Sequence, residues 1–369
     1  GRFIRDEFHV DESNIQLYGI IAALKVFNMP MTTSLFCRFF EIKERKFGSR
    51  LKERFVYRHV EPVIYREGPE TLQPKHDVIA DLFFLFHRET ASINSLVCDL
   101  LQAMYEDEIE LFLANTANKK EVLGGKKPIV GKIAYWDYMK SIYDRIQGGI
   151  CNLSQDARAY LCMGLLWAGG QRHIAFDSVE SMVQKIAPAI DDSLLCRKLY
   201  NEWGIWYAKN KHDKLAEEKF LAVIAHDRQQ IPARTELGRL LSRQKGRETE
   251  AEQFLREAIR IDPKNLHPHT ELGRLLSRQK GREGEAEAFL REAIRIDPKN
   301  LHPHTELGRL LLRQKGREEE AKDLHARTVL AQLYEKMDRI PEARKLYREL
   351  CEIDPGNRFG REGLARLKP

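Results

Sequence analysis

The sequence lacks a long apolar run and a strong excess of charge of one sign. No uncharged apolar stretch approaches the roughly 18 residues that a membrane-spanning helix needs, and the N-terminus carries mixed charges instead of a signal-peptide core. The formal net charge of +6 is small for 61 basic and 55 acidic residues, which argues against a dedicated nucleic-acid binder. We therefore expect a cytoplasmic protein that does not bind membranes.

Paired cysteines are also missing. The six cysteines have no CxxC spacing and lie mostly within apolar helical patterns: Cys37, Cys98, Cys151, Cys162, Cys196 and Cys351. Structural zinc sites need closely spaced ligands, and disulfides are rare in the cytosol. The sequence therefore predicts neither a disulfide framework nor a metal site, and the 43% hydrophobic and 31% charged composition is that of a globular protein.

A repeat of 35 residues dominates the C-terminal half. Residues 235–265 recur at 270–300 with two changes, and residues 266–283 recur at 301–318 with one change. A fixed period of this length is typical of solenoids built from stacked helix pairs. The period therefore predicts an α-helical solenoid.

Each repeat resembles the tetratricopeptide repeat (TPR), a pair of antiparallel helices A and B. The matching residues in one copy are Leu272, Gly273, Ala286, Phe289, Ala293 and Pro298. The glycine allows close approach of helix B, and proline ends helix B because it cannot donate a backbone hydrogen bond. The extra residue relative to the usual 34 is placed in the turn between the helices. The resemblance implies an all-α TPR superhelix that binds another protein.

Weaker copies flank the strong ones. The matching positions before them are Met163, Gly164, Trp167, Trp203, Gly204, Tyr207, Ala216 and Phe220. After them the matches are Leu330, Ala331, Tyr334, Ala343, Tyr347, Leu350 and Pro355. Because Leu307 and Leu330 are only 23 residues apart, we expect the third copy to lack part of helix B. A fused helix over Glu318–Met337 and a terminal cap over Arg358–Pro369 are predicted.

The resemblance also implies a ligand groove lined by helix A. The positions carried over are Thr235, Arg239, Ser242 and Arg243, then His267, Thr270, Arg274, Ser277 and Arg278, then His302, Thr305, Arg309, Leu312 and Arg313. Guanidinium groups bind carboxylates in a bidentate manner, so this arginine ladder predicts an acidic protein segment as the ligand. The alternative is a solvated face whose arginines pair with Glu236, Glu271 and Glu306 of the same helices. The lysine and asparagine clamp of co-chaperone repeats is not evident.

Histidines flank the prolines at the start of helix A: His267, His269, His302 and His304. Two HxH motifs at a fixed period could bring metal ligands together. No cysteine or carboxylate completes such a site, so we interpret these histidines as duplicated residues at the start of the helix.

The N-terminal third has a different pattern. The expected elements are helices Ile15–Phe27, Thr33–Phe40 and Glu44–Phe55, followed by extended runs Pro62–Tyr65 and Thr71–Gln73. This order predicts a winged-helix-like domain. A turn is expected at Met29, Pro30 and Met31.

The predicted fold class is therefore all-α, a TPR-type superhelix preceded by a small winged-helix-like helical domain. The connector between them should contain helices Ile93–Phe112 and Tyr135–Ile146, with a polar loop over Asn115–Gly131. The predicted domains are the winged-helix-like domain at 1–90, the connector at 91–150 and the superhelix at 151–369, with strong repeats at 232–265, 266–300 and 301–325 and a last repeat at 326–357.

The end of the winged-helix-like pattern resembles the ATPase module of STAND-type signalling ATPases, the relatives of NLR receptors. There, a methionine-histidine-aspartate motif follows the winged helix, and its histidine contacts the phosphates of bound ADP. His76 and Asp77 match two positions, whereas Lys75 replaces the methionine. The resemblance implies that His76 senses nucleotide. Alternatively, Asp77 only caps the apolar helix Val78–Phe86 and His76 is a surface residue.

The chain has no phosphate-binding loop to complete such an ATPase. The stretch Gly125–Ile133 has five residues between its glycines where the loop has four, and isoleucine where a Mg²⁺-binding hydroxyl is needed. We interpret it as a linker. No cofactor is expected in this chain, and ATP or ADP would bind only to an upstream domain of a larger protein.

These observations favour a sensor module of a STAND-type ATPase, of the kind found in bacterial antiviral defence, with a protein ligand such as a phage protein and with homo-oligomerisation of the full-length protein. A free-standing scaffold or adaptor is the alternative. A DNA-binding regulator is disfavoured because Glu41, Glu44 and Glu53 interrupt the basic residues of the N-terminal domain. No catalytic residues are predicted, since neither a nucleophile with its base nor a metal cluster is evident.

Overall fold

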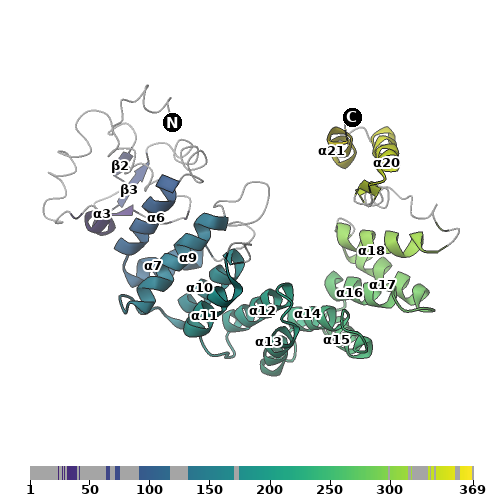
Figure 1. The fold of residues 1–369 in the computed structure, drawn as a ribbon, viewed down its shortest axis with the longest axis horizontal. Coiled ribbons are helices and arrows are strands. Elements are labelled where there is room, and N and C mark those ends of the chain that lie inside the picture. Colours follow the sequence, from purple (N-terminus) through teal and green to yellow (C-terminus); the bar gives the residue numbers. More distant parts are fainter. Residues whose placement is uncertain are drawn as a thin grey trace. The chain divides into compact units, whose positions relative to one another are not determined.

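The computed structural model describes the chain in two compact units, Gly1–Asn210 and Lys211–Pro369, which are treated separately below (Figure 1). The described residues are 24, 27, 29, 31–39, 41, 64–66, 71–74, 91–116, 132–169, 174–297, 300–314, 317, 331–332, 334–335, 338–353 and 358–367. Apart from three short strands, the elements in these ranges are helices. The predicted all-α class is therefore confirmed.

A small antiparallel sheet lies in the N-terminal unit. It contains β1 (Met31–Thr32), β2 (Ile64–Arg66) and β3 (Thr71–Pro74) in the order β1-β3-β2, and α3 (Thr33–Phe39) follows β1 directly. Tyr65 is paired with Gln73. Strands β2 and β3 overlap the two predicted extended runs, whereas β1 includes a residue of the predicted turn. The predicted helices Glu44–Phe55 and Val78–Phe86, and most of Ile15–Phe27, lie outside the described residues.

The predicted helix Ile93–Phe112 is two helices, α6 (Ala91–Ala103) and α7 (Glu106–Asn115). The break has a local cause, because Glu108 accepts a hydrogen bond of 2.8 Å from the backbone N–H of Tyr105 and so caps the start of α7. The carbonyl of Met104, freed by the break, accepts a 2.8 Å hydrogen bond from buried Arg145 of α9 (Lys132–Gln147). Helix α9 contains the second helix predicted for this region.

Helices α10 (Gln155–Ala168), α11 (Phe176–Ile186) and α12 (Leu194–Lys209) complete this unit, with α10 in contact with both other helices. The residues that matched the repeat pattern here are buried: Met163, Gly164, Trp167, Trp203, Gly204 and Tyr207. Tyr207 also donates a 2.8 Å hydrogen bond to Glu180 of α11. Apolar spacing in the sequence therefore identified the core of this degenerate part correctly.

The C-terminal unit is built from helices that pack against one another in the order of the sequence (Figure 1). They are α13 (Asp213–His226), α14 (Ile231–Leu241), α15 (Glu248–Ile261), α16 (Leu266–Leu276), α17 (Glu283–Ile296) and α18 (Leu301–Leu312). Helix α14 pairs with α15, and α16 with α17, as helices A and B of successive repeats. The A helix α16 also contacts the A helices of the repeats before and after it, α14 and α18. This arrangement places equivalent residues of successive A helices side by side.

A glycine in helix A allows helix B of the same repeat to pack close to it. A Cβ on Gly273 would lie 2.6 Å from Cγ of Leu290 and 3.1 Å from the carbonyl of Ala286. Leu290 and not Phe289 therefore fills the large position of helix B, which corrects the sequence assignment. The backbone at Gly281, in the turn where the extra residue was predicted, has φ +85°, a conformation that glycine adopts readily.

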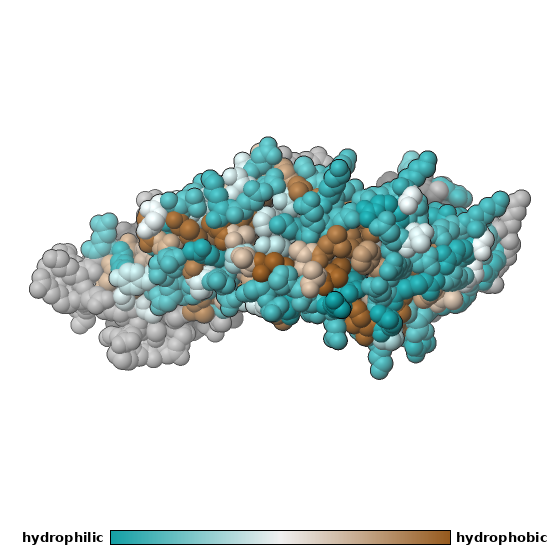
Figure 2. Space-filling model, turned by 90° about the horizontal axis from the view of Figure 1, so that it is seen from below, coloured by the Kyte–Doolittle hydropathy of each residue, from teal (hydrophilic) through white to brown (hydrophobic). Residues whose placement is uncertain are grey.

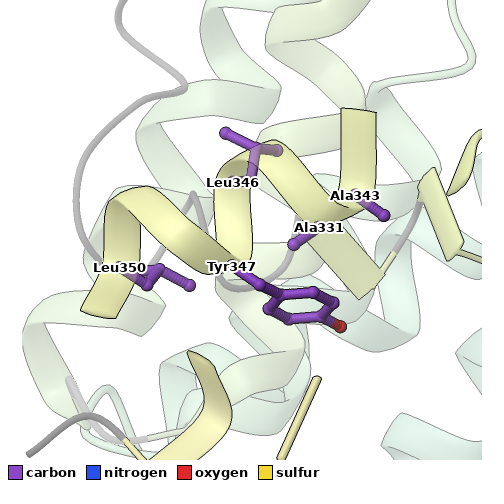
Figure 3. Packing of buried hydrophobic residues seen from close by; sticks show 5 residues of the cluster. All are labelled: Ala331, Ala343, Leu346, Tyr347 and Leu350. Atoms are coloured by element: carbon purple, nitrogen blue, oxygen red, sulfur yellow. The ribbon is translucent and has the colours of Figure 1, made fainter. Parts of the chain in front are cut away.

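The C-terminal end contains α20 (Ile340–Ile353) and α21 (Arg358–Arg366). Four residues of α20 join Ala331 in an apolar cluster (Figure 3), and the buried members are Ala331, Ala343, Leu346, Tyr347 and Leu350. Tyr347 donates a 2.9 Å hydrogen bond to Glu335. The predicted fused helix Glu318–Met337 lies mostly outside the described residues.

Candidate functional site

The predicted groove positions lie on α14, α16 and α18 or in the one or two residues that follow each of these helices, and we call this surface the A-helix face. It carries two rows of arginines at the 35-residue spacing. The paired row is Arg239, Arg274 and Arg309, and the open row is Arg243, Arg278 and Arg313. The two rows differ in their carboxylate partners.

Each arginine of the paired row binds a glutamate three residues earlier on its own helix. The Nε of Arg239 donates to Glu236 at 2.8 Å, and Nη1 of Arg309 donates to Glu306 at 2.6 Å. Arg274 forms the equivalent ion pair with Glu271. The alternative raised from the sequence, that these arginines pair within their helices, is therefore correct for this row.

Glu271 connects two successive repeats. Its Oε1 lies 3.6 Å from Nε2 of His302, which belongs to the next A helix. Burial alone would raise the pKa of Glu271, but the contact with His302 and the charges of Arg274 and Arg239 outweigh burial and lower this pKa. Glu271 is thus an ionised, largely buried carboxylate whose charge is already neutralised by its neighbours.

The open row is exposed and has no carboxylate partner among the described residues. Partial burial, followed by the positive charges of Arg239 and Arg274, lowers the pKa of Arg243 despite the opposing effect of Glu271 and Glu236. The two neighbouring arginines thus act on Arg243 from its own helix and from the next repeat.

A hollow of about 320 Å³ adjoins the last arginine of the open row. It is lined by Ser277, Glu283, Leu310, Arg313 and Gln314. The structure therefore brings two of the predicted groove positions, Ser277 and Arg313, to one hollow contributed by two successive repeats. The hydroxyl of Ser277 donates to the carbonyl of Arg274 at 2.9 Å.

The threonines predicted for the groove need a correction. Thr270 is 0% exposed, and its hydroxyl donates to the carbonyl of Leu266 at 2.8 Å. Thr235 is also buried, and its hydroxyl donates a hydrogen bond of 2.8 Å to the carbonyl of Ile231. Both hydroxyls are therefore used within their own helices, and both side chains are buried. Thr270 therefore cannot contact a ligand, whereas Thr305 is half-buried.

The histidines divide into two pairs. His267 and His302 are exposed on the A-helix face, whereas His269 and His304 are buried. Nε2 of His269 donates to the carbonyl of Pro263 at 2.9 Å, which ties helix A to the preceding turn. Within the described ranges, no group of three or more His, Cys, Asp or Glu residues is placed to hold a metal ion.

A second set of ion pairs, which the sequence reasoning missed, joins successive repeats. Arg247 binds Glu217 through two contacts of 2.6 and 2.9 Å, and Arg282 binds Glu252 through contacts of the same lengths. Arg317 binds Glu287 in the same way. Arginine and glutamate recurring 30 residues apart were the available clue. These arginines hold the repeats together and are not free for a ligand.

The predicted nucleotide-sensing residues His76 and Asp77 lie outside the described residues, as does most of Gly125–Ile133. In the part of the chain that the structure describes, no helix is both long and apolar enough to cross a membrane. The face shown in Figure 2 is mainly hydrophilic, with small separate hydrophobic areas.

Several solved structures resemble this chain. A thermophilic TPR protein of Thermus thermophilus is 21% identical and covers 46% of this chain and 98% of its own, with a TM-score of 0.34. PilF of Pseudomonas aeruginosa is 19% identical and covers 57% and 97%, with a TM-score of 0.38. A signal transduction ATPase with numerous domains (STAND) and a TPR sensor, from Pyrococcus horikoshii, is 13% identical over 97% of this chain and 60% of its own, with a TM-score of 0.44. At these identities a shared function does not follow.

No curated protein matches the chain. Two family models, both described as tetratricopeptide repeat, match the chain: one covers residues 231–265 and 267–300, and the other covers residues 324–367. These segments include Gly238, Gly273, the first two arginines of each row and the cluster around Tyr347, whereas Arg309 and Arg313 lie outside them. The three segments are therefore tetratricopeptide repeats, and such repeats imply interaction with other proteins.

Proposed function

We propose that the A-helix face binds a protein ligand and that the open row supplies the charged contacts. The observation that carries this proposal is the difference between the two rows. The paired row is neutralised by Glu236, Glu271 and Glu306, whereas the open row is exposed and has no carboxylate partner among the described residues. Guanidinium groups without a partner form bidentate contacts with carboxylates at little cost in reorganisation.

Affinity capture with mass spectrometry tests this proposal. The bait is the full chain, compared with a variant in which the three open-row arginines are changed to alanine. The matched control removes three exposed arginines from the B helices, Arg260, Arg291 and Arg295. A protein retained by the chain and the control but lost with the open-row variant is the expected result. A set of bound proteins that is the same for all three baits would contradict the proposal.

We propose, as the finer function, that the chain is the sensor of a STAND-type ATPase that recognises a foreign protein such as a phage protein. The order β1-β3-β2, with β2 and β3 forming a hairpin, supports a winged helix, because that domain contains a three-stranded sheet of this order. The match of His76 and Asp77 to the family's motif is the second support. In that family ligand binding is coupled to nucleotide exchange and to oligomerisation.

The coding sequence upstream of Gly1 tests this assignment directly. An ATPase domain with a phosphate-binding loop is expected there, and the purified full-length protein should carry ADP that a His76→Ala variant loses. A gene that encodes no nucleotide-binding domain would rule out the sensor and leave a free-standing scaffold.

A further inference from the structure

We infer that the ligand of the A-helix face is an acidic segment in the polyproline II conformation, with a carboxylate at every third residue. This inference rests on the proposed function and specifies its ligand. Each repeat contributes one open-row arginine from an equivalent place near the end of helix A. The ligand must therefore present its anionic groups at the spacing of neighbouring A helices.

The distance between neighbouring A helices determines which ligand conformation fits the open row. Neighbouring packed helices have axes roughly 8–10 Å apart, and α14, α16 and α18 are such neighbours. A polyproline II helix rises about 3.1 Å per residue with three residues per turn, so every third side chain lies on one face with a repeat of about 9 Å. In a β-strand the side chains on one face repeat at roughly 6.7 Å or 13 Å, and neither distance fits.

Charge on the A-helix face favours a peptide over a nucleic acid. The open row runs beside the paired row, where Glu236, Glu271 and Glu306 place carboxylates along the same helices. A phosphodiester backbone carries a charge at every nucleotide and binds best to surfaces of one sign. A single file of isolated positive charges instead matches isolated carboxylates separated by uncharged residues.

Like charges near the open row add a driving force for an anion. Arg243 lies close enough to Arg239 and to Arg274 of the next repeat for their charges to act on it. A carboxylate bound at Arg243 relieves this repulsion. Binding should therefore weaken as salt concentration rises, because salt screens exposed charges.

Fluorescence anisotropy with defined peptides tests the inference. The probe is a labelled peptide of three Glu-Pro-Pro units, and its control has the same nine residues with the three glutamates at every second position, so that only the period differs. We expect the period-three peptide to bind about tenfold or more tighter than the control peptide. Changing the open row to alanine should weaken binding of the period-three peptide by about tenfold or more. Changing the open row to lysine should give intermediate affinity, since lysine keeps the charge and loses the planar fork.

The B-helix control variant, with Arg260, Arg291 and Arg295 changed to alanine, should bind the period-three peptide as the unchanged chain does. Equal affinity for the two peptides, equal loss in both variants, or tighter binding of a labelled single-stranded oligothymidine would each overturn the inference. Circular dichroism of each variant excludes unfolding as the cause of a loss. If the peptides fail but affinity capture still depends on the open row, protein binding stands and only the ligand class is wrong.

Discussion

A single glutamate on each A helix decides which arginines can meet a ligand. Arg239 and Arg243 lie four residues apart, yet only Arg239 has Glu236 three residues before it on the same helix. Sequence spacing raised this pairing as an alternative, but the burial of Thr270 and the contact between His302 and Glu271 depend on tertiary packing. Such contacts join residues about one repeat apart, which helical periodicity alone does not specify.

Changing Gly273 to alanine should destabilise the chain by roughly 1–3 kcal/mol, because the added Cβ overpacks the α16–α17 contact. The nearest atom is Cγ of Leu290 at 2.6 Å, with backbone just beyond it. Urea denaturation measures the change. Gly284→Ala is the matched control, since nothing lies within 4 Å of its new Cβ, and it should be neutral or stabilising. Equal destabilisation by both changes would contradict the packing argument.

Glu252 should make stability depend on pH in the acid range. The hydrogen bond from Arg282, opposed by burial and helped by Arg256, lowers the pKa of Glu252 to about 2 from an ordinary value of 4.5. Because the folded-state pKa is the lower one, the stabilisation is complete above about pH 4.5 and disappears as the pH falls toward 2. Glu252→Gln should therefore cost about 1 kcal/mol at pH 7 and almost nothing at pH 2. Denaturation of the unchanged chain and of Glu252→Gln at several pH values tests this, and a stability difference that stays the same from pH 7 to pH 2 would contradict it.

At the level of elements, the helices themselves were easier to predict than their ends. The apolar period located the repeat helices, and the extra residue of each repeat was assigned to the turn that contains Gly281. The break between α6 and α7 was missed because the apolar pattern continues through it. Its cause is local, since the side chain of Glu108 accepts a hydrogen bond from the backbone at the start of α7. The assignment of Phe289 failed for a similar reason, since Phe289 and Leu290 both follow Ala286 at helical spacing.

Tyr347 should control the stability of the C-terminal element alone. Its ring is fully buried, so Tyr347→Ala should cost about 3–5 kcal/mol at this site. In a solenoid each repeat contacts only its neighbours, and a terminal repeat can therefore open by itself. Hydrogen exchange should show lost protection in α20 and α21 and unchanged protection in α14–α17. Tyr347→Phe loses the hydrogen bond that the hydroxyl donates to Glu335 and the 3.4 Å one that it accepts from Arg366, and should have a smaller effect of about 0.5–1.5 kcal/mol. Uniform loss of protection would indicate a single cooperative unit instead.

At the scale of the whole chain, the near-identity of the repeats is matched by near-identity of their contacts. The pairs Arg247–Glu217 and Arg282–Glu252 have the same two distances, and Gly238 and Gly273 meet equivalent leucines. The sequence therefore determined the solenoid of the C-terminal unit through repetition. The winged-helix-like part, which lacks internal repetition, remains a prediction that rests on pattern and on three short strands.

Adding one more copy of residues 266–300 after Asn300 should stabilise the chain. The new copy brings the same glycine contact and the same inter-repeat ion pair, so its interfaces reproduce existing ones. We expect Tm to rise by roughly 2–8 °C, and a longer period-three peptide with one more Glu-Pro-Pro unit should bind more tightly. A lower Tm, or unchanged affinity for the longer peptide, would contradict the equivalence of the repeats.

Because each repeat carries one open-row arginine, the number of these arginines changes in evolution together with the number of repeats. Unequal recombination between two near-identical copies removes or inserts a whole repeat, together with its glycine, its ion pair and its open-row arginine. Such an event keeps the 35-residue spacing of the open-row arginines and changes only their number. Ligand preference can thus shift in steps of three peptide residues without any substitution in the core.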